Sequence, residues 1–459
     1  MSASDRGRLS YAAVLRLPYA RRTFAAALLG RLSYGMLALS VMLTVTRATG
    51  SYAVAGTITA LFGATGVILA PVRAALVDRH GPRLALLPMA LLYAGLLGAL
   101  AAAAWQPGAP VLPLGTIAAA AGAAMPPLGP SMRAVWCELT GEPALLQRAY
   151  SLDGVAEEVL LVSGPLLVGA LVQIAPPAAG IVVSALLVGG GTLAFVMSPA
   201  VRDVRPAAAA AAAAAEAEGT AHSGARVRGT RALLTPVVVA AGVGLSLGAM
   251  DLLVLAFVTA HQHGDDMAAW VLAALSAGST IGGLLNGAVS WQAGARVRLP
   301  RLAVGLGLAL AAAGLAPGVG TLTVAVACAG FFVAPALTTA YLLADEAAPR
   351  ERRTRAGAWV NTAVNAGISG GTATAGLLAA RLPLGVCFAL SGGVTVLAAM
   401  ACAVRKPEAA GPPLGEGCPG SQESAQGEES PALSPRPRRP CSAEGVPRSS
   451  PGSRTGNRR

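Results

Sequence analysis

Charge is scarce in this 459-residue sequence, and lysine is almost missing. Charged residues make up 12% of the chain, against roughly 25% in an ordinary soluble domain. This scarcity excludes an ordinary soluble globular protein. Lys406 is the only lysine, so arginine supplies almost all of the positive charge behind the net charge of +12. Outside the C-terminal tail these arginines stand between apolar stretches, which indicates membrane orientation rather than nucleic-acid binding.

Motifs for metal or covalent chemistry are also missing. The six cysteines show no CxxC or other ligand spacing, so we expect neither a disulfide framework nor a metal site. His261, His263, Asp265 and Asp266 share one short loop, which we interpret as a solvated polar turn rather than as metal ligands. Without a nucleophile, a metal cluster or a phosphate-binding loop, the sequence indicates no enzyme and no cofactor.

Long apolar stretches are abundant. Apolar residues make up 54% of the chain, and they gather in runs of about 20 residues, which cross roughly 30 Å of hydrocarbon as a helix. The expected spans are 24–46, 52–72, 84–104, 111–133, 151–175, 178–198, 233–260, 268–290, 302–317, 319–344, 356–380 and 383–404. The sequence therefore predicts an all-α polytopic membrane protein with twelve transmembrane helices.

The polar segments divide these spans into two groups of six. We expect a cytoplasmic N-terminus (1–23), a six-helix bundle (24–198), an Ala-rich linker (199–231), a second bundle (232–404) and a disordered tail (405–459). Summed over alternate connections, Lys and Arg number twenty-two on one side and two on the other, which places both termini in the cytoplasm. The preference for Arg over Lys and the richness in Ala, Gly and Pro favour a bacterial cytoplasmic membrane.

An internal repeat supports two related halves. Corresponding residues lie at nearly constant offsets: Gly122 and Pro127 match Gly330 and Pro335 at 208, Arg148, Gly164 and Gly169 match Arg355, Gly371 and Gly376 at 207, and Gly81 and Arg83 match Gly294 and Arg296 at 213. Such spacing is typical of two parallel repeats related by an axis along the membrane normal.

The loop after the second span carries a recognisable signature. Asp78, Arg79, Gly81 and Arg83 match Gly-x-x-x-Asp-Arg/Lys-x-Gly-Arg/Lys-Arg/Lys, although Ala74 stands at the first Gly and a proline replaces one basic residue. This loop resembles the signature of the major facilitator superfamily. The resemblance implies that fold, and a transporter whose halves alternate. We expect Asp78 to latch the halves through charge-assisted hydrogen bonds to a helix end, although a solvated positive loop is the alternative.

Two further comparisons with that family concern export and coupling. Gly164, Pro165 and Gly169 in the fifth span partly match its antiporter motif, which is associated with efflux, although close helix packing would explain them nearly as well. Many proton-coupled members carry an arginine in the fourth span, where this sequence has Ala118. The commonest coupling scheme of the family is therefore not expected here.

Ionisable residues inside apolar spans are costly and invite a functional interpretation. They are Arg31, Asp153, Glu157, Glu158 and Asp251. We expect the pair Glu157 and Glu158 to include a proton-coupling site, with Arg31 as counter-charge and Asp251 as the second candidate. In the alternative, Arg31 only holds helices together and Asp153 sits at the interface.

A polar stripe on the eleventh span consists of Asn361, Asn365, Ser369 and Thr372. Together with the acidic fifth span it is expected to line a central cavity, whereas hydrogen bonding between helices is the alternative. The leading prediction is a monomeric secondary transporter that exports a small molecule in exchange for protons. The alternatives are an importer or facilitator of a polar metabolite and, less favoured, a membrane sensor or membrane-embedded enzyme.

Overall fold

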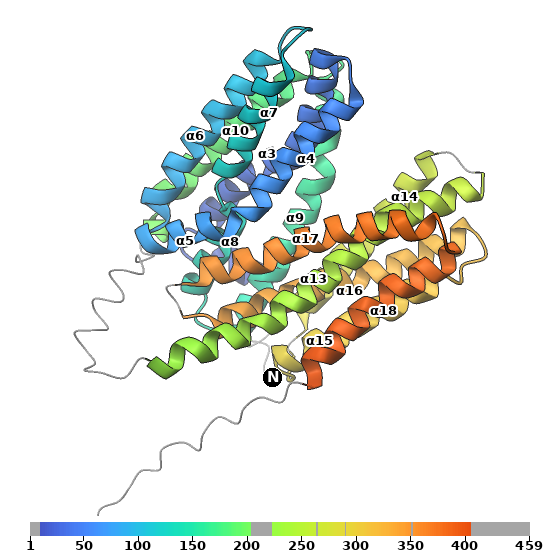
Figure 1. The fold of residues 1–459 in the computed structure, drawn as a ribbon. Coiled ribbons are helices and arrows are strands. Elements are labelled where there is room, and N and C mark those ends of the chain that lie inside the picture. Colours follow the sequence, from blue (N-terminus) through green and yellow to red (C-terminus); the bar gives the residue numbers. More distant parts are fainter. Residues whose placement is uncertain (1–9, 203–222, 263–264, 290, 350–351, 405–459) are drawn as a thin grey trace, which may run out of the picture. The chain divides into compact units, whose positions relative to one another are not determined.

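The structure is a computed structural model that describes residues 10–202, 223–262, 265–289, 291–349 and 352–404, with only the backbone described for 223–231, 265–266 and 403–404. All elements in these ranges are helices, which confirms the predicted all-α class (Figure 1).

The short helix α2 (Tyr11–Arg16) precedes the first half, residues 20–202. The first half contains α3 (Ala20–Thr49), α4 (Tyr52–Ile68), α5 (Ala70–His80), α6 (Pro82–Ala103), α7 (Val111–Ala124), α8 (Leu128–Leu139), α9 (Pro143–Leu171), α10 (Ala178–Met197) and α11 (Pro199–Arg202). The second half contains α13 (Ser223–Ala260), α14 (Asp265–Ala288), α15 (Ala295–Ala313), α16 (Val319–Ala347), α17 (Arg353–Ala379) and α18 (Leu384–Val404).

Each of the twelve expected spans corresponds to one helix or to one interrupted pair of helices. Within the described ranges, nine segments are long and apolar enough to cross a membrane, and the bent pair α4–α5 makes ten. The other two expected spans are α15, whose first turns hold three arginines, and α17, which carries the polar stripe. Both pack against strongly apolar helices, because α15 lies against α18 and α17 lies against α13.

Several helices extend further than the hydrophobic pattern predicts. α9 begins at Pro143 instead of 151, α15 begins at Ala295 instead of 302, and α3 begins at Ala20 instead of 24. Proline at the first positions of α9 is compatible with a helix start because the missing N–H has no helical partner there. The predicted linker is also shorter, since α13 already begins at Ser223. Residues 203–222 and the tail 405–459 lie outside the described residues.

Two spans of the first half are interrupted. α4 and α5 meet at a 42° bend, and Pro71 follows directly as one of the first residues of α5. α7 ends before Met125, and α8 starts after Pro127. Two successive prolines, Pro126 and Pro127, remove two backbone donors and disfavour helical backbone before them, which explains this second break.

Small residues allow the helices of each half to pack closely. In the first half, a Cβ at Gly35 would lie 2.6 Å from the carbonyl oxygen of Leu160 on α9. In the second half, Gly248 on α13 abuts the backbone of Ile368 on α17, and these two helices run side by side (Figure 1). Such contacts are typical of membrane helices, because packing rather than hydrophobic burial drives their association.

The two halves touch near one set of helix ends. We call this the basic end: it comprises the described parts of the loops 80–82, 139–143, 288–295 and 347–353, beside which the arginines gather. The contacts between halves join α4, α5 and α8 to α17, and α9 to α14 and α16. Their hydrogen bonds reach as far as Thr362 and Ser279, each nine residues from the helix ends at Arg353 and Ala288.

Candidate functional site

Four charged side chains of the first half form one ion network. Arg31 on α3 places Nη1 2.6 Å from Asp153 Oδ1 and Nη2 2.9 Å from Glu157 Oε2. Arg133 on α8 places Nε 3.2 Å from Asp153 Oδ2 and Nη2 2.9 Å from the same Glu157 oxygen. Asp153 and Glu157 stand one turn apart on α9, so both carboxylates face the two guanidinium groups.

The members of this network differ sharply in exposure. Asp153 is fully buried, and Arg31 and Arg133 retain 4% and 6% of their side-chain exposure, whereas Glu157 is 51% exposed. Two positive and two negative charges balance, which offsets part of the cost of burying them. Glu157 is therefore the network member that the described residues do not enclose.

Arg133 is a residue that the sequence interpretation missed, because it was counted among solvated loop charges. The sequence feature that could have indicated its burial is its position inside the apolar run 128–137. The break at Pro127 makes this run a separate helix. The guanidinium carbon of Arg133 lies 3.7 Å from the ring centroid of Tyr341 on α16. Tyr341 Oη is in turn 3.5 Å from Asn361 Oδ1 on α17, so the network reaches into the second half.

Glu158 has a different partner from its neighbour. Its carboxylate accepts a 2.8 Å hydrogen bond from the hydroxyl of Ser279 on α14, across the boundary between the halves. Among the described residues, the ion pairs of the fifth span involve Asp153 and Glu157 but not Glu158. Asp251 lies apart from this group, exposed on α13.

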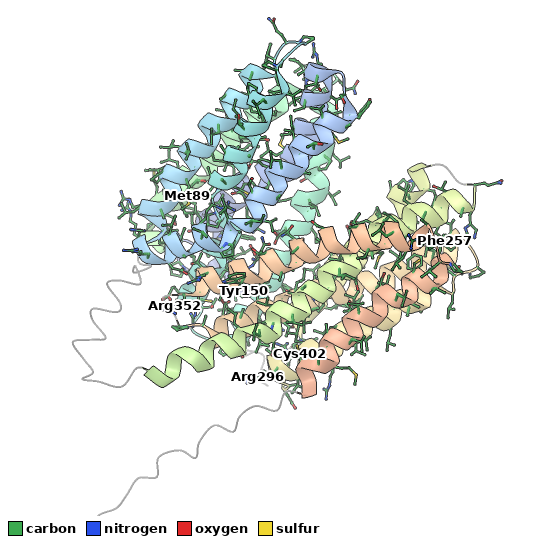
Figure 2. All side chains as sticks on the ribbon, in the orientation of Figure 1. Met89, Tyr150, Phe257, Arg296, Arg352 and Cys402 are labelled. Atoms are coloured by element: carbon green, nitrogen blue, oxygen red, sulfur yellow. The ribbon has the colours of Figure 1, made fainter. Side chains whose placement is uncertain are left out.

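A second buried acid, Asp345, was not expected from the sequence because it lies at the end of the tenth span. The hydroxyl of Tyr150 donates to its carboxylate, and Cys137 Sγ lies 3.8 Å away. Tyr150, labelled in Figure 2, belongs to α9, so this contact also joins the halves. The two partners are 195 residues apart, so the local sequence around neither of them indicates this contact.

The signature loop stands at the other crossing of the halves. Asp78 Oδ2 accepts a 2.9 Å hydrogen bond from the backbone N–H of Arg355, in the first turn of α17. Gly81 ends α5 with φ +83°, a conformation that favours glycine. Arg79 and Arg83 are exposed. The structure therefore brings Asp78 to the second half but leaves both arginines of the signature at the surface.

The short helix α2 contacts the same end of the molecule. The hydroxyl of Tyr11 donates to the carbonyl of Leu284 on α14 at 2.6 Å. Burial raises the pKa of Tyr11 to about 12, so this hydroxyl stays protonated and remains a donor at physiological pH. Beside it, Arg148 Nη2 lies 3.3 Å from the carbonyl of Ala288, and Gln147 Nε2 lies 2.6 Å from that of Asn286.

Arg73 is a buried residue that the sequence interpretation treated as a loop charge. From α5 it donates to the carbonyls of Gly122 at 2.8 Å, Ala123 at 3.0 Å and Gly66 at 2.6 Å. These carbonyls lie beside the two helix breaks. An unpaired backbone group costs several kcal/mol in hydrocarbon, so Arg73 stabilises the two breaks by donating hydrogen bonds to their carbonyls.

The glycine and proline motif of α9 is only partly explained by close packing. A Cβ at Gly164 would lie 2.6 Å from the carbonyl oxygen of Gly35, so this position requires a glycine. Gly169 is exposed and a Cβ there would meet no neighbouring atom within 4 Å. Close approach of helices therefore accounts for Gly164 and not for Gly169, while Pro165 lies inside the helix.

The polar stripe of α17 is largely satisfied within its own helix. Asn365 donates to the Asn361 carbonyl at 2.8 Å, and Ser369 donates to the Asn365 carbonyl at 3.1 Å. Thr372 Oγ1 is 2.9 Å from the carbonyl of Gly248 on α13. Asn361 is the member of the stripe that lies next to the ion network, through Tyr341.

The expected polar turn near residue 263 lies only partly within the described residues. His263 and the side chains of Asp265 and Asp266 lie outside the described residues, so this interpretation stays a prediction. Among the described residues, no group of three or more His, Cys, Asp or Glu side chains is placed to hold a metal ion.

Comparison with known proteins gives one family. Residues 23–319 and 239–440 match the sequence profile of the Major Facilitator Superfamily. No curated protein sequence matches the chain significantly.

The fold is similar to that of solved transporters. The human organic anion transporter MFSD10 (TETRAN) gives a TM-score of 0.63 at 16% identity, over 84% of this chain and 100% of that chain. A bacterial homologue of the iron transporter ferroportin, in an outward-facing state, gives 0.64 at 14% identity over 84% and 98%. The E. coli fucose:proton symporter gives 0.58 at 13% identity over 85% and 99%. At such identities the likeness concerns the fold alone.

Proposed function

This chain belongs to the Major Facilitator Superfamily of membrane transporters, and on that premise we propose that it moves a small molecule across the membrane by alternating access coupled to protons. It is a multi-pass membrane protein and not an enzyme. One charge crossing 100 mV supplies about 2.3 kcal/mol, enough for roughly a fifty-fold solute gradient. The proposed unit is a monomer, with the proton as the coupling ion.

This proposal rests on one observation: the adjacent acids Glu157 and Glu158 have partners in different halves of the protein. Glu157 is held by two arginines of its own half, whereas Glu158 accepts a hydrogen bond from Ser279 of the other half. A change of access must separate Glu158 from Ser279. A proton that binds or leaves this pair therefore alters a contact that the transport cycle has to break. Asp251 lies outside this arrangement and stays the second candidate.

The proposed orientation places the basic end in the cytoplasm, because positively charged loops are retained there. The contacts between halves at that end then close the cytoplasmic side. The similar ferroportin homologue was solved in an outward-facing state, which agrees with this interpretation. The proposed location is the cytoplasmic membrane of a bacterium, with both termini inside.

Two transport directions are proposed. Efflux follows from the partial antiporter motif, Gly164, Pro165 and Gly169. Import or facilitated diffusion of a polar metabolite is the second candidate, and the polar contact from Arg133 through Tyr341 to Asn361 favours it. Flux in right-side-out vesicles compared with inverted vesicles separates the two directions.

The coupling proposal is tested with Glu157→Gln, Glu158→Gln and Asp251→Asn in proteoliposomes. A thermal-shift screen on the purified protein first supplies a ligand, whose flux is then measured across an imposed pH gradient and, separately, as exchange without a gradient. At least one glutamate variant is expected to lose gradient-driven flux while it retains exchange, because exchange does not require the proton to leave. Asp251→Asn should keep both activities.

The matched control is Glu142→Gln, which removes an exposed carboxylate before α9 that caps no backbone N–H. It should behave like the wild type. Full pH-driven flux in both glutamate variants would show that these acids are structural and that coupling occurs elsewhere.

A further inference from the structure

Arg31 and Arg133 form a cradle around one carboxylate oxygen. Each guanidinium group places one nitrogen 2.9 Å from Glu157 Oε2 and another nitrogen on Asp153. Arginine presents several N–H donors in a planar fork, so two arginines aimed at one position constitute a strong carboxylate site. In this conformation the protein's own Glu157 fills that position.

The two acids of the network are not equivalent as occupants. Asp153 is fully buried and contacts both arginines, so it is a fixed part of the cradle. Glu157 is about half exposed and makes its contacts through a single oxygen. A carboxylate that reaches the cradle can therefore replace Glu157 without displacing any buried group.

We propose that the cradle of Arg31 and Arg133 binds the carboxylate of a monoanionic organic substrate, which displaces Glu157 while Glu157 takes up a proton. This inference rests on the proposed function, because it assigns a substrate class to the same ion network. The step is a change of partners: the ion pairs of Glu157 break, those of the substrate form, and the proton comes from solvent.

Charge balance links the proton to the anion. With Glu157 in place the cradle and its two acids are neutral; with the substrate bound and Glu157 protonated they are neutral again. Binding without the proton would leave one excess negative charge beside buried groups, which is costly. The groups that face Glu157 are Arg31 from α3, Arg133 from α8 and Tyr341 from α16, together with Asp153 and Glu158 of α9 itself.

The neighbours of the cradle favour an anion with a flat apolar body. The ring of Tyr341 stacks on Arg133, and it belongs to the other half. A planar substrate held by the arginines would lie near both this ring and Asn361. Because anion and proton then travel together, an inward proton gradient would drive uptake. The inference therefore favours import over efflux, with a planar organic anion in place of the polar metabolite of that second candidate.

The probe is benzoate, with benzamide as its neutral counterpart and benzylamine as its cationic one. Binding is measured by calorimetry on the purified full-length protein at about pH 6 and about pH 8, where benzoate itself remains ionised. Wild-type protein should bind benzoate more tightly at the lower pH, and neither analogue should bind comparably. A pH-sensitive dye in weak buffer should report uptake of one proton for each benzoate bound.

The decisive variant is Glu157→Gln, which mimics the protonated acid. At about pH 8 it should bind benzoate at least tenfold more tightly than the wild type, and its affinity should no longer depend on pH. Glu142→Gln should show wild-type affinity and pH dependence. Arg133→Lys keeps the charge but loses the planar fork, so its affinity for benzoate should fall.

Three results would overturn the inference: no gain in affinity in Glu157→Gln, preference for benzylamine, or benzoate binding to the wild type without proton uptake. The last measurement needs no variant, so poor folding of Glu157→Gln leaves the inference testable. If benzoate fails while flux of another ligand still depends on Glu157 or Glu158, the substrate class is wrong and the coupling proposal stands.

Discussion

The two halves of the chain build equivalent helices with different backbones. In the first half the fourth span is split into α7 and α8, whereas its counterpart in the second half, α16, is continuous. The repeat offset of 208 explains the difference, because Pro126 and Pro127 correspond to Ala334 and Pro335. A single proline is accommodated inside α16, while two in succession stop the helix. The second span shows the same contrast, with α4 and α5 opposed to the unbroken α14.

The broken half uses carbonyls beside its helix breaks for contacts between segments. Tyr34 donates to the carbonyl of Pro126 at 2.5 Å. Pro71 cannot bond to the carbonyl of Val67, which instead lies 3.3 Å from the hydroxyl of Thr362 in the other half. The breaks in the helices thus leave carbonyl acceptors that side chains of neighbouring segments reach.

The continuous half meets its neighbours at the end of an unbroken helix, through both the side chain and the carbonyl of one residue. At the offset of 213, Arg73 corresponds to Asn286. Asn286 Nδ2 lies 3.4 Å from Ser151 Oγ, and its own carbonyl accepts a hydrogen bond from Gln147. The equivalent position therefore serves a helix break in one half and a contact between halves in the other.

The largest expected effect follows from removing the arginine that only the broken half needs. Arg73→Met removes the guanidinium group that donates to the carbonyls of Gly66, Gly122 and Ala123, of which only that of Gly122 also accepts from a backbone N–H, that of Met125 at 3.4 Å, among the described residues. Each buried acceptor left unpaired costs about 1–3 kcal/mol. Recovery of monodisperse protein and its thermal midpoint in detergent should therefore fall steeply.

Asn286→Leu is the matched change in the continuous half, and it should lower stability much less, because no helix break depends on its side chain. Arg73→Lys should give an intermediate result, since an ammonium group reaches fewer of the three carbonyls. Equal stability of Arg73→Met and the wild type would mean that the breaks need no internal donor.

A smaller effect is expected at the crossing of α5 and α17. Asp78→Asn keeps the shape of the side chain but removes the charge that accepts from the Arg355 N–H at the start of α17. The pseudo-equivalent crossing of α14 and α9 carries Trp291 at this position and has no such acid. Loss of a charge-assisted hydrogen bond of about 1.5–3 kcal/mol should reduce flux roughly tenfold or more, with expression near normal.

Flux of a thermal-shift ligand in proteoliposomes checks this effect, with Glu142→Gln as the control for loss of a surface charge. If Asp78→Asn transports at the wild-type rate, the signature loop only helps to set the membrane orientation. The two crossings would then be equivalent in function.

Much of the fold could be predicted from the sequence, because each span needs a long apolar run and the repeats align at fixed offsets. The ends of helices were harder. α15 begins before its predicted start because Arg298 lies inside the helix, where it is buried and donates to Gln147. Counting arginines by side gave an orientation, but it treated Arg73, Arg133 and Arg298 alike as solvated charges.

The site could be predicted in part. Arg31 and Glu157 were singled out by their cost inside apolar spans, and the structure places them 2.9 Å apart. Arg133 and Asp345 were missed because each lies near a span end, where a charge is cheap. Asp345 is buried by partners that lie more than a hundred residues away in the sequence. Arg133 is buried because a helix break places it on a separate helix. Neither is visible in local periodicity.

The smallest expected effect concerns a glycine that the continuous half keeps and the broken half has lost. Gly287 on α14 corresponds to Ala74 on α5 at the offset of 213. A Cβ at Gly287 would lie 2.7 Å from Ser151 Cβ on α9 and would also press on the hydroxyl of Tyr11. Gly287→Ala must therefore push α14 away from α9 and should cost about 1–3 kcal/mol of stability, with flux reduced severalfold.

Ala74→Gly, the reverse change, should cost only about 1 kcal/mol through helix propensity. Combining Gly287→Ala with Ser151→Gly and Tyr11→Ala should restore much of the thermal midpoint, because both obstacles are removed. If Gly287→Ala alone matches the wild type in midpoint and flux, the close contact of α14 with α9 does not limit closure, and the glycine has no more importance there than in the broken half.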